Sequence, residues 1–301
     1  MSQIKVGFVG YGGSAKTYHL PYLLPVKEFH IYAFLQRAAA PSTESAAPGS
    51  HCTVDFPEAK HYRTAEEFFG DPAIELVIVT THTDTHGSFA QKALEAGKHV
   101  VVEKPFTRTS EEADNLLALS KEKGLILTVY QSIDSAKDRR WDGEFRTLQH
   151  LVNKNAFGTI TEAQIYYDFE NPPWIKYLSA KEYTPGDGLL FGLDDIQERQ
   201  TLSGMSSTDS AFGVNPEDEY GTLTTYKEFD SALQTFEPSS KKYVGNFPTL
   251  NGFNQGYYES LADTIRRKAP LQVDPQTPRD GIRLMELARE SHDTGRTVLW
   301  R

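Results

Sequence analysis

The sequence predicts an α/β protein in which a doubly wound parallel sheet is followed by a shortened α+β domain. Two observations predict the first part. An apolar strand beginning at Ile4 breaks into glycines where a helical stretch begins, and apolar, β-rich runs then alternate with helices up to residue 131. Right-handed crossovers place such strands in one parallel sheet, with a ligand crevice beyond their carboxyl ends.

The helices and strands of this half can be assigned in order. A capping pair, Thr64 and Glu67, begins one helix, and a second helix covers residues 85–96. A third runs from Ser110, with acidic residues first and basic residues last, as the helix dipole favours. The strand-like runs after the first are residues 30–36, 76–81, 99–103 and 125–131. We therefore expect one domain over residues 1–131 and a second over residues 132–301.

The glycine-rich turn has the residues that a phosphate-binding turn needs. Gly10 permits a tight turn, and Gly12 lets the backbone approach a pyrophosphate. Ala15 keeps the next helix close to its strand, and Gly13 and Ser14 lie between, where free N–H groups attract an anion. The turn indicates dinucleotide binding, although glycines after a strand can also serve only to reverse the chain.

The end of the second strand indicates which nicotinamide cofactor is bound. An acidic residue about 20 positions after the glycine turn would bind the ribose hydroxyls of NAD. Here the strand ends in Gln36 and Arg37, so no carboxylate is available. The planar, permanently charged guanidinium of Arg37 suits a 2'-phosphate. NADP is therefore favoured over NAD, the alternative being that Arg37 is only a surface residue at a strand end.

Composition argues against several classes of partner. The 301 residues suffice for about two domains, and 39% hydrophobic residues suffice for ordinary cores. A net charge of −10 argues against nucleic acid and anionic membranes. No apolar run reaches the roughly 18 residues of a membrane span, and the chain opens on a strand rather than a signal peptide. We expect a cytoplasmic protein without a membrane contact.

No metal site is expected from the sequence. Cys52 is the single cysteine, lies in a polar stretch and has no identifiable partner, so an unreactive thiol is predicted. His82 and His86 are four residues apart, but His82 should precede the helix that carries His86. The two would then not share the helical face that a metal pair needs.

A second motif lies at residues 96–105. The run Ala-Gly-Lys-His at 96–99 leads through a buried strand into Glu103, Lys104 and Pro105. Together with the glycine turn, this resembles the glucose-fructose oxidoreductase and inositol dehydrogenase family, written Gfo/Idh/MocA. The resemblance implies a Rossmann domain followed by a domain whose open, largely antiparallel sheet carries the substrate site and a homo-oligomer contact. It also implies hydride transfer between NAD(P) and a sugar-like or polyol-like small-molecule alcohol.

The resemblance assigns roles to particular residues. Lys104 would be the catalytic residue, binding or deprotonating the substrate hydroxyl, and it would need a lowered pKa for that work. Its neighbour Glu103 should point to the opposite face of the strand and be structural. The cofactor contacts implied around this motif are Thr81, His86, Glu103, Lys104 and Pro105.

The chain departs from the family pattern in its second half. Family members have an Asp-x-Gly-x-His element whose histidine is a second acid–base group, whereas Gly192 and Ile196 stand at the expected aspartate and histidine positions. An internal deletion between Phe191 and Gly192 would explain this. Residues 159–170 are the clear strand candidate of the second domain, and residues 220–225 a weaker one. We expect a thinned domain and impaired activity, the alternative function being a catalytically silent NAD(P)-binding regulator or scaffold.

Overall fold

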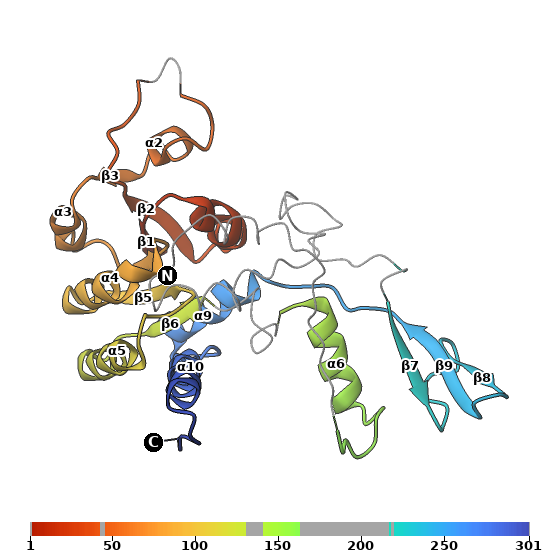
Figure 1. The fold of residues 1–301 in the computed structure, drawn as a ribbon. Helices are drawn as coiled ribbons and strands as arrows, with labels where there is room; N and C mark the ends of the chain where they lie inside the picture. Colours follow the sequence, from red (N-terminus) through yellow and green to blue (C-terminus); the bar gives the residue numbers. More distant parts are fainter. Residues whose placement is uncertain (1, 43–45, 131–140, 163–216, 218–219, 301) are drawn as a thin grey trace. The chain divides into compact units, whose positions relative to one another are not determined.

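The computed structural model describes residues 2–42, 46–130, 141–162, 217 and 220–300 (Figure 1). The chain divides into two compact units. The first unit contains residues 1–131 together with 255–301. The second contains the described residues 141–162, 217 and 220–254. Residues 191, 192 and 196, which carry the expected deletion, lie outside the described part of the chain.

The first unit is built on a six-stranded parallel sheet. Its order is β3-β2-β1-β4-β5-β6, so the order of the strands reverses between β1 and β4, where a ligand crevice is expected (Figure 1). The strands are β1 (Ile4–Val9), β2 (Phe29–Leu35), β3 (Lys60–Tyr62), β4 (Leu76–Val79), β5 (His99–Glu103) and β6 (Leu127–Tyr130). The predicted doubly wound sheet is confirmed, and β3 is a strand that the sequence pattern did not predict.

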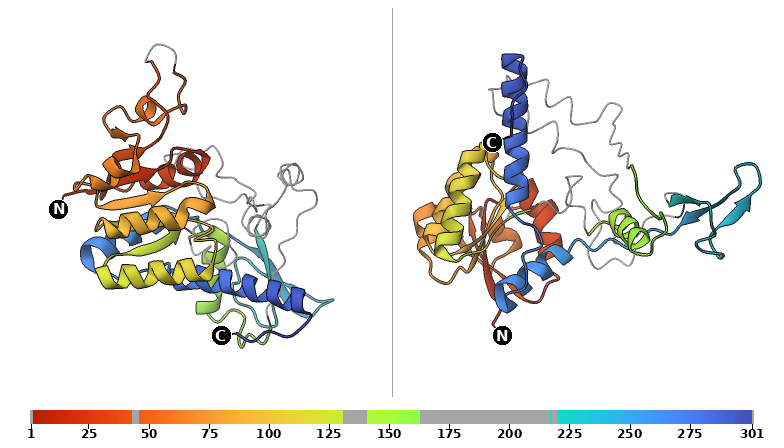
Figure 2. Two further views of the ribbon diagram at one scale, coloured as in Figure 1. Left: turned by 60° about the vertical axis from the view of Figure 1, so that its left-hand side comes forward. Right: turned by 90° about the horizontal axis from the view of Figure 1, so that it is seen from below.

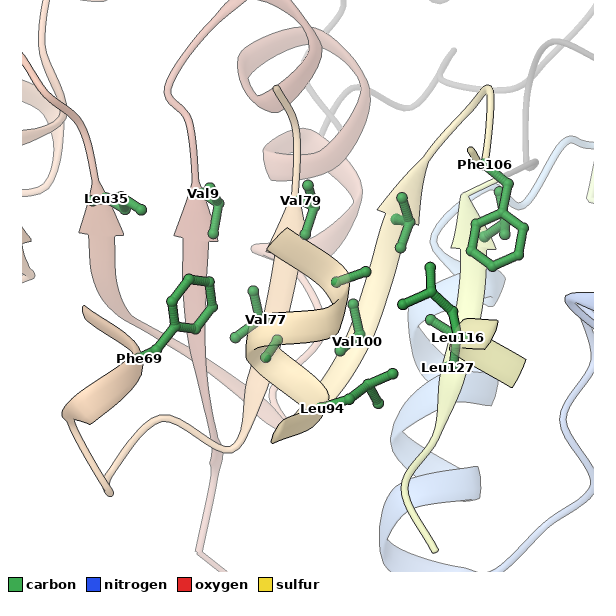
Figure 3. Packing of buried hydrophobic residues seen from close by; sticks show 14 of the residues in the cluster. Val9, Leu35, Phe69, Val77, Val79, Leu94, Val100, Phe106, Leu116 and Leu127 are labelled. Carbon is green, nitrogen blue, oxygen red and sulfur yellow. The ribbon is translucent and has the colours of Figure 1, made fainter. Parts of the chain in front are cut away.

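Helices cover both faces of this sheet. On one face, Phe69, Leu94 and Leu116 pack against valines and leucines of the strands (Figure 3). They belong to α3 (Ala65–Gly70), α4 (Thr83–Glu95) and α5 (Ser110–Lys123), and α4 and α5 lie side by side (Figure 2). On the other face lie a π-helical turn, η1 (Ala15–His19), the short α1 (Leu20–Leu23) and α9 (Gly256–Arg267). Another short helix, α2 (Cys52–Asp55), precedes β3.

Local sequence signals explain where these helices begin and end. The Thr64 hydroxyl donates to the Glu67 carboxylate at 2.7 Å and accepts the Glu67 N–H at 3.4 Å, so Thr64 caps the helix as predicted and pairs with Glu67 through their side chains. The cap of α5 is Thr109, one residue before the expected start, and Gly124 ends the helix at φ +64°. A left-handed backbone conformation at this position favours glycine, because glycine has no Cβ.

The C-terminal helices belong to the first unit. Tyr257 and Tyr258 of α9 are fully buried there, and α10 (Gln276–Thr294) is joined to α5. Arg279 forms a bidentate pair with Asp114, and Glu286 accepts from both the N–H and the hydroxyl of Ser110. The sequence assigned residues 255–301 to the second domain, and the structure groups them with the first unit. A division into two independently folding domains at residue 131 stays a prediction.

The second unit contains a smaller antiparallel sheet. Its order is β7-β9-β8, with β7 (Gly221–Thr225), β8 (Thr235–Glu237) and β9 (Lys242–Phe247), and it is accompanied by α6 (Gly143–Asn153). The weaker strand candidate is confirmed as β7, whereas β8 and β9 were not expected. Residues 159–162 form no strand, and the rest of that candidate lies outside the described residues. In the described residues, no helix has the length and hydropathy of a membrane span.

Candidate cofactor site

The glycine turn joins the carboxyl ends of three strands. Gly10 has φ +100°, and its N–H donates to the Leu35 carbonyl at the end of β2 at 3.0 Å. A Cβ at Gly10 would lie 3.0 Å from the Thr80 carbonyl oxygen, just beyond the end of β4. Only glycine combines this dihedral angle with so close a backbone approach, because every other residue would add a side chain at the contact. The predicted role of Gly10 in a tight turn follows from these contacts.

A cavity of about 860 Å³ opens at this edge of the sheet. It lies where the strand order reverses, because its walls come from the ends of β1, β2 and β4 and from the start of α4. The structure brings together here six residues that the sequence predicted as cofactor contacts: Gly10, Gly12, Gly13, Ser14, Arg37 and Thr81.

Two glycines of the cavity lining leave space beside the main chain. A Cβ built at Gly12 or at Gly13 would meet no atom within 4 Å, so the two glycines leave open space beside the main chain. Only Ser14 lies between Gly13 and η1, and backbone N–H groups at a helix start attract anions. A side chain at either glycine would occupy this open space.

Two arginines line the outer end of the cavity. Arg37 directly follows Gln36 after β2, and Arg63 directly follows β3. The Nε of Arg63 donates to the main-chain carbonyl of Arg37 at 3.1 Å, which holds the two residues together. Within the described part of the chain, neither guanidinium forms an ion pair with a carboxylate. Sequence reasoning missed Arg63 because it missed β3; a basic residue after the short run Lys60–Tyr62 was the available signal.

Lys104 directly follows β5, at the carboxyl edge of the sheet. β5 pairs with β4, with Val102 opposite Val79, so Lys104 and Thr81 each lie two residues beyond a paired position. The N–H of Lys104 donates to the Glu103 carboxylate at 2.8 Å. Among the described residues, the cavity lining does not include Ala15, His86, Glu103, Lys104 or Pro105. Their contacts with a cofactor or substrate stay predictions.

Glu103 is a buried carboxylate with three hydrogen-bond donors. The Ser14 hydroxyl, His19 Nε2 at 3.0 Å and the Lys104 N–H at 2.8 Å all point to it. Burial by itself would raise the pKa of Glu103, but the hydrogen bond and charge of His19, the bond from Ser14 and the charge of Lys104 outweigh it. The net pKa of Glu103 is therefore below its ordinary value. Glu103 points into a polar network, and its structural role stays a prediction.

Two further members of this network were not expected as site residues. The Nδ1 of His19 is hydrogen-bonded to the Tyr258 hydroxyl, and the His19 ring lies against Tyr130, with centroids 4.0 Å apart. Burial, followed by the nearby hydroxyls of Tyr130 and Tyr257 and by Glu103, raises the pKa of Tyr258 well above its usual value. Tyr258 therefore stays protonated, and its hydroxyl is hydrogen-bonded to Nδ1 of His19 while Nε2 faces the Glu103 carboxylate. Tyr258 lies 239 residues from His19, so no local pattern could pair them.

His86 connects the loop after β4 to the loop after β5. Its Nδ1 lies 2.7 Å from the Pro105 carbonyl oxygen, and its Nε2 lies 2.9 Å from the Thr81 carbonyl oxygen. His86 is buried within α4, whereas His82 is the residue that caps this helix, as predicted. His86 thus links Thr81, which lines the cavity, to the segment that follows Lys104.

Comparison with known proteins agrees with this geometry. Residues 4–131 match the model of the Gfo/Idh/MocA oxidoreductase family, described as an NAD-binding Rossmann fold. The chain belongs to this family. It is 28% identical to scyllo-inositol 2-dehydrogenase (NADP(+)) IolW of Bacillus subtilis, covering 98% of this chain and 96% of that protein. It is also 34% identical to the uncharacterised oxidoreductase YhhX of Escherichia coli, over 77% of this chain and 65% of that protein.

The family likeness extends to solved structures. The oxidoreductase YvaA of Bacillus subtilis matches with a TM-score of 0.72 and 26% identity, covering 100% of this chain and 99% of that one. The α/β fold of the Gfo/Idh/MocA family is therefore present. The alignment with IolW spans 370 residues, more than the 301 of this chain, so parts of IolW have no counterpart here. This agrees with a shortened chain and does not locate the missing part.

Proposed function

We propose that the protein is an NADP-preferring oxidoreductase that acts on a sugar-like or polyol-like alcohol. The single observation that carries the cofactor preference is the pair Arg37 and Arg63 at the outer end of the cavity, where no carboxylate ends β2. A 2'-phosphate is bound well by planar guanidinium groups. When bound, a nicotinamide dinucleotide would supply the hydride acceptor or donor of the reaction.

The remaining contacts in this proposal follow the length of the cavity. The main chain at Gly12 and Gly13 would hold the pyrophosphate, and Ser14, whose hydroxyl already donates to Glu103, would flank it through its main chain. Thr81 and the loop braced by His86 would continue toward the catalytic end. These assignments rest on the lining of one cavity and on the open space beside its glycines.

Lys104 is the proposed catalytic residue. In the oxidation of an alcohol its amine would take the hydroxyl proton, and in the reverse direction its ammonium would return it. Glu103 would be a positioning residue, because it binds the Lys104 N–H and not a reacting atom. The position of Lys104 one residue beyond β5, on the edge that carries the cavity, supports this role.

The proposed substrate class follows the activity for which a relative is named. IolW is named for oxidising scyllo-inositol with NADP(+), and this chain covers 96% of it. A polyol or a sugar-like alcohol is therefore the first class to test. We also propose a cytoplasmic protein that forms a homo-oligomer through its C-terminal sheet and has no nucleic-acid partner. An exposed aromatic on β8, Phe236, is consistent with a contact at this sheet.

Binding and turnover should be measured separately on the full chain. We expect NADPH to bind more tightly than NADH in calorimetry, and NADP+ to be reduced with a panel of inositols and sugar alcohols. Lys104→Ala should lose about 10²- to 10⁴-fold in kcat and keep NADPH affinity. Lys121→Ala, an exposed lysine on α5, is the matched control. NADPH binding without turnover in the unmodified protein would favour the silent regulator or scaffold instead.

A further inference from the structure

Three side chains of types that can bind a metal ion lie close together beside the segment that carries Arg37. His51 caps α2, Cys52 is the first residue of that helix, and His61 lies in β3. One ring nitrogen of each histidine and the Cys52 sulfur lie within 4.8 Å of one another. The Cys52 sulfur is 3.9 Å from His51 Nδ1, and the two imidazole rings meet edge to face, with centroids 4.8 Å apart. His51 and Cys52 are buried, and His61 is half-buried.

The surrounding main chain orients both imidazole rings. His61 Nε2 lies 2.9 Å from the Gln36 carbonyl oxygen, and His51 Nε2 lies 3.3 Å from that of Ala38. A carbonyl oxygen only accepts, so each neutral ring carries its hydrogen on Nε2 and keeps a lone pair on Nδ1. A ring N–H directed at a backbone carbonyl is the usual support of a histidine that binds a metal through its other nitrogen.

We propose that His51, Cys52 and His61 bind a soft divalent cation of the Zn²⁺ type. Sulfur and imidazole nitrogen are the ligands that such ions prefer, whereas Mg²⁺ and Ca²⁺ prefer oxygen. In a tetrahedral site with bonds of about 2.0–2.3 Å, ligand atoms lie about 3.3–3.6 Å apart. The Cys52 sulfur and His51 Nδ1 are 3.9 Å apart, which is already near this range. The most widely separated ligand atoms lie within 4.8 Å of each other and would have to approach by about 1 Å.

The fourth ligand would be water. The nearest acid of the same helix, Asp55, already accepts from the Tyr11 hydroxyl at 2.6 Å and from the Gly49 N–H at 2.9 Å. On binding, the S–H bond of Cys52 breaks, a sulfur–metal bond forms and the proton leaves to solvent. The ion must also displace the Thr53 N–H and the Thr53 hydroxyl, which lie 3.2 Å and 2.9 Å from His51 Nδ1. The free energy gained on metal binding must exceed the cost of losing the thiol proton and of displacing the Thr53 donors.

The position of the cluster gives such an ion a structural consequence. His61 and His51 hold the carbonyls of Gln36 and Ala38, the residues on either side of Arg37. The Cys52 N–H also donates to the Gln36 side chain at 3.0 Å. A bound ion would therefore brace the segment that carries Arg37. This proposal does not depend on the proposed function, because it concerns binding of the ion alone.

Cobalt provides a direct test, because a thiolate–Co²⁺ bond gives a near-ultraviolet charge-transfer band. In this test, chelator-treated protein without cofactor would be titrated with Co²⁺ and then with Zn²⁺. The expected result is a thiolate band that saturates at one equivalent and is displaced by Zn²⁺. Cys52→Ser should abolish the band, and His61→Gln should weaken Co²⁺ affinity more than about tenfold. His292→Gln, an exposed histidine on α10, should leave it unchanged.

Thermal melts give a second measurement that does not depend on a variant folding. Zn²⁺ should raise the Tm of the unmodified protein, and a chelator should reverse the rise, because a ligand that binds only the folded state stabilises it. The absence of a thiolate band at one equivalent in the unmodified protein would overturn the proposal. So would a band that persists in a folded Cys52→Ser variant, or one that requires His292.

Discussion

Ser14 and Glu103 are joined by a hydrogen bond, although 89 residues separate them in the chain. Ser14 lines the cavity, and Glu103 is buried beneath it at the end of β5. Glu103 also binds His19 and the N–H of Lys104. The wall proposed to hold the phosphates and the lysine proposed for catalysis are therefore connected through one carboxylate.

The charge of Glu103 should make the stability of the fold depend on pH. Its pKa is lower in the folded state than the value of about 4.3 expected when unfolded. Its contribution is therefore complete above that value and is lost as the pH falls toward the folded pKa. We expect Glu103→Gln to lower the free energy of unfolding by about 1–3 kcal/mol at neutral pH.

Urea unfolding between about pH 6 and the acid limit of the fold would measure this. The difference between the unmodified protein and Glu103→Gln should be constant at the upper end and shrink below about pH 5. Glu122→Gln, an exposed glutamate on α5, is the control. A difference that grows as the pH falls would contradict the argument.

The two arginines should set the cofactor preference together. Replacing Arg37 or Arg63 by alanine removes a charge-assisted hydrogen bond to a 2'-phosphate, worth about 1.5–3 kcal/mol. We expect each variant to bind NADPH about 10- to 100-fold more weakly and NADH unchanged. Arg296→Ala, an exposed arginine after α10, should change neither affinity. Equal losses for NADPH and NADH would mean that the arginines hold something other than the 2'-phosphate.

Alanine substitutions at Gly10 and at Gly12 should have different effects, the first on the stability of the fold and the second on NADPH binding. Gly10→Ala would force a Cβ to within 3.0 Å of the Thr80 carbonyl at a dihedral angle that alanine disfavours. It should lower the free energy of unfolding by more than about 1 kcal/mol. Gly12→Ala meets no protein atom within 4 Å, so it should leave stability nearly unchanged and still weaken NADPH binding.

Thermal melts and calorimetry on the two glycine variants test that separation. The proposed phosphate position would be wrong if Gly12→Ala bound NADPH as tightly as the unmodified protein. Gly13→Ala, where a Cβ also meets no protein atom within 4 Å, should behave as Gly12→Ala does.

The two units should melt separately. In the described residues of the second unit, Leu151 and Leu223 are its buried hydrophobic side chains, while Tyr226 and Phe236 are 79% and 53% exposed. A three-stranded sheet with so little burial is near the lower limit for independent stability. Scanning calorimetry should therefore show two transitions, and NADPH should raise the upper one, that of the first unit. A single cooperative transition would show that the two units unfold together and would contradict this prediction.

Local sequence determined the elements whose causes lie within a few residues. The glycine turn, the cap of Thr64 and the alternation of apolar strands with helices predicted the parallel sheet and six of the residues that line the cavity. Lys104 could be placed at the carboxyl edge because every strand of a parallel sheet ends there. The short strand β3 was missed because three residues carry too little alternation, and Arg63 was missed with it.

Tertiary structure decided the contacts between distant segments. Tyr258 reaches His19, Glu286 holds Ser110, and His61 meets Cys52 only because the chain folds them together. Each such pair depends on the packing of whole helices and strands, which no single stretch of sequence specifies. The sequence therefore determined the Rossmann sheet and its phosphate turn, and the fold decided which polar side chains are buried beneath them.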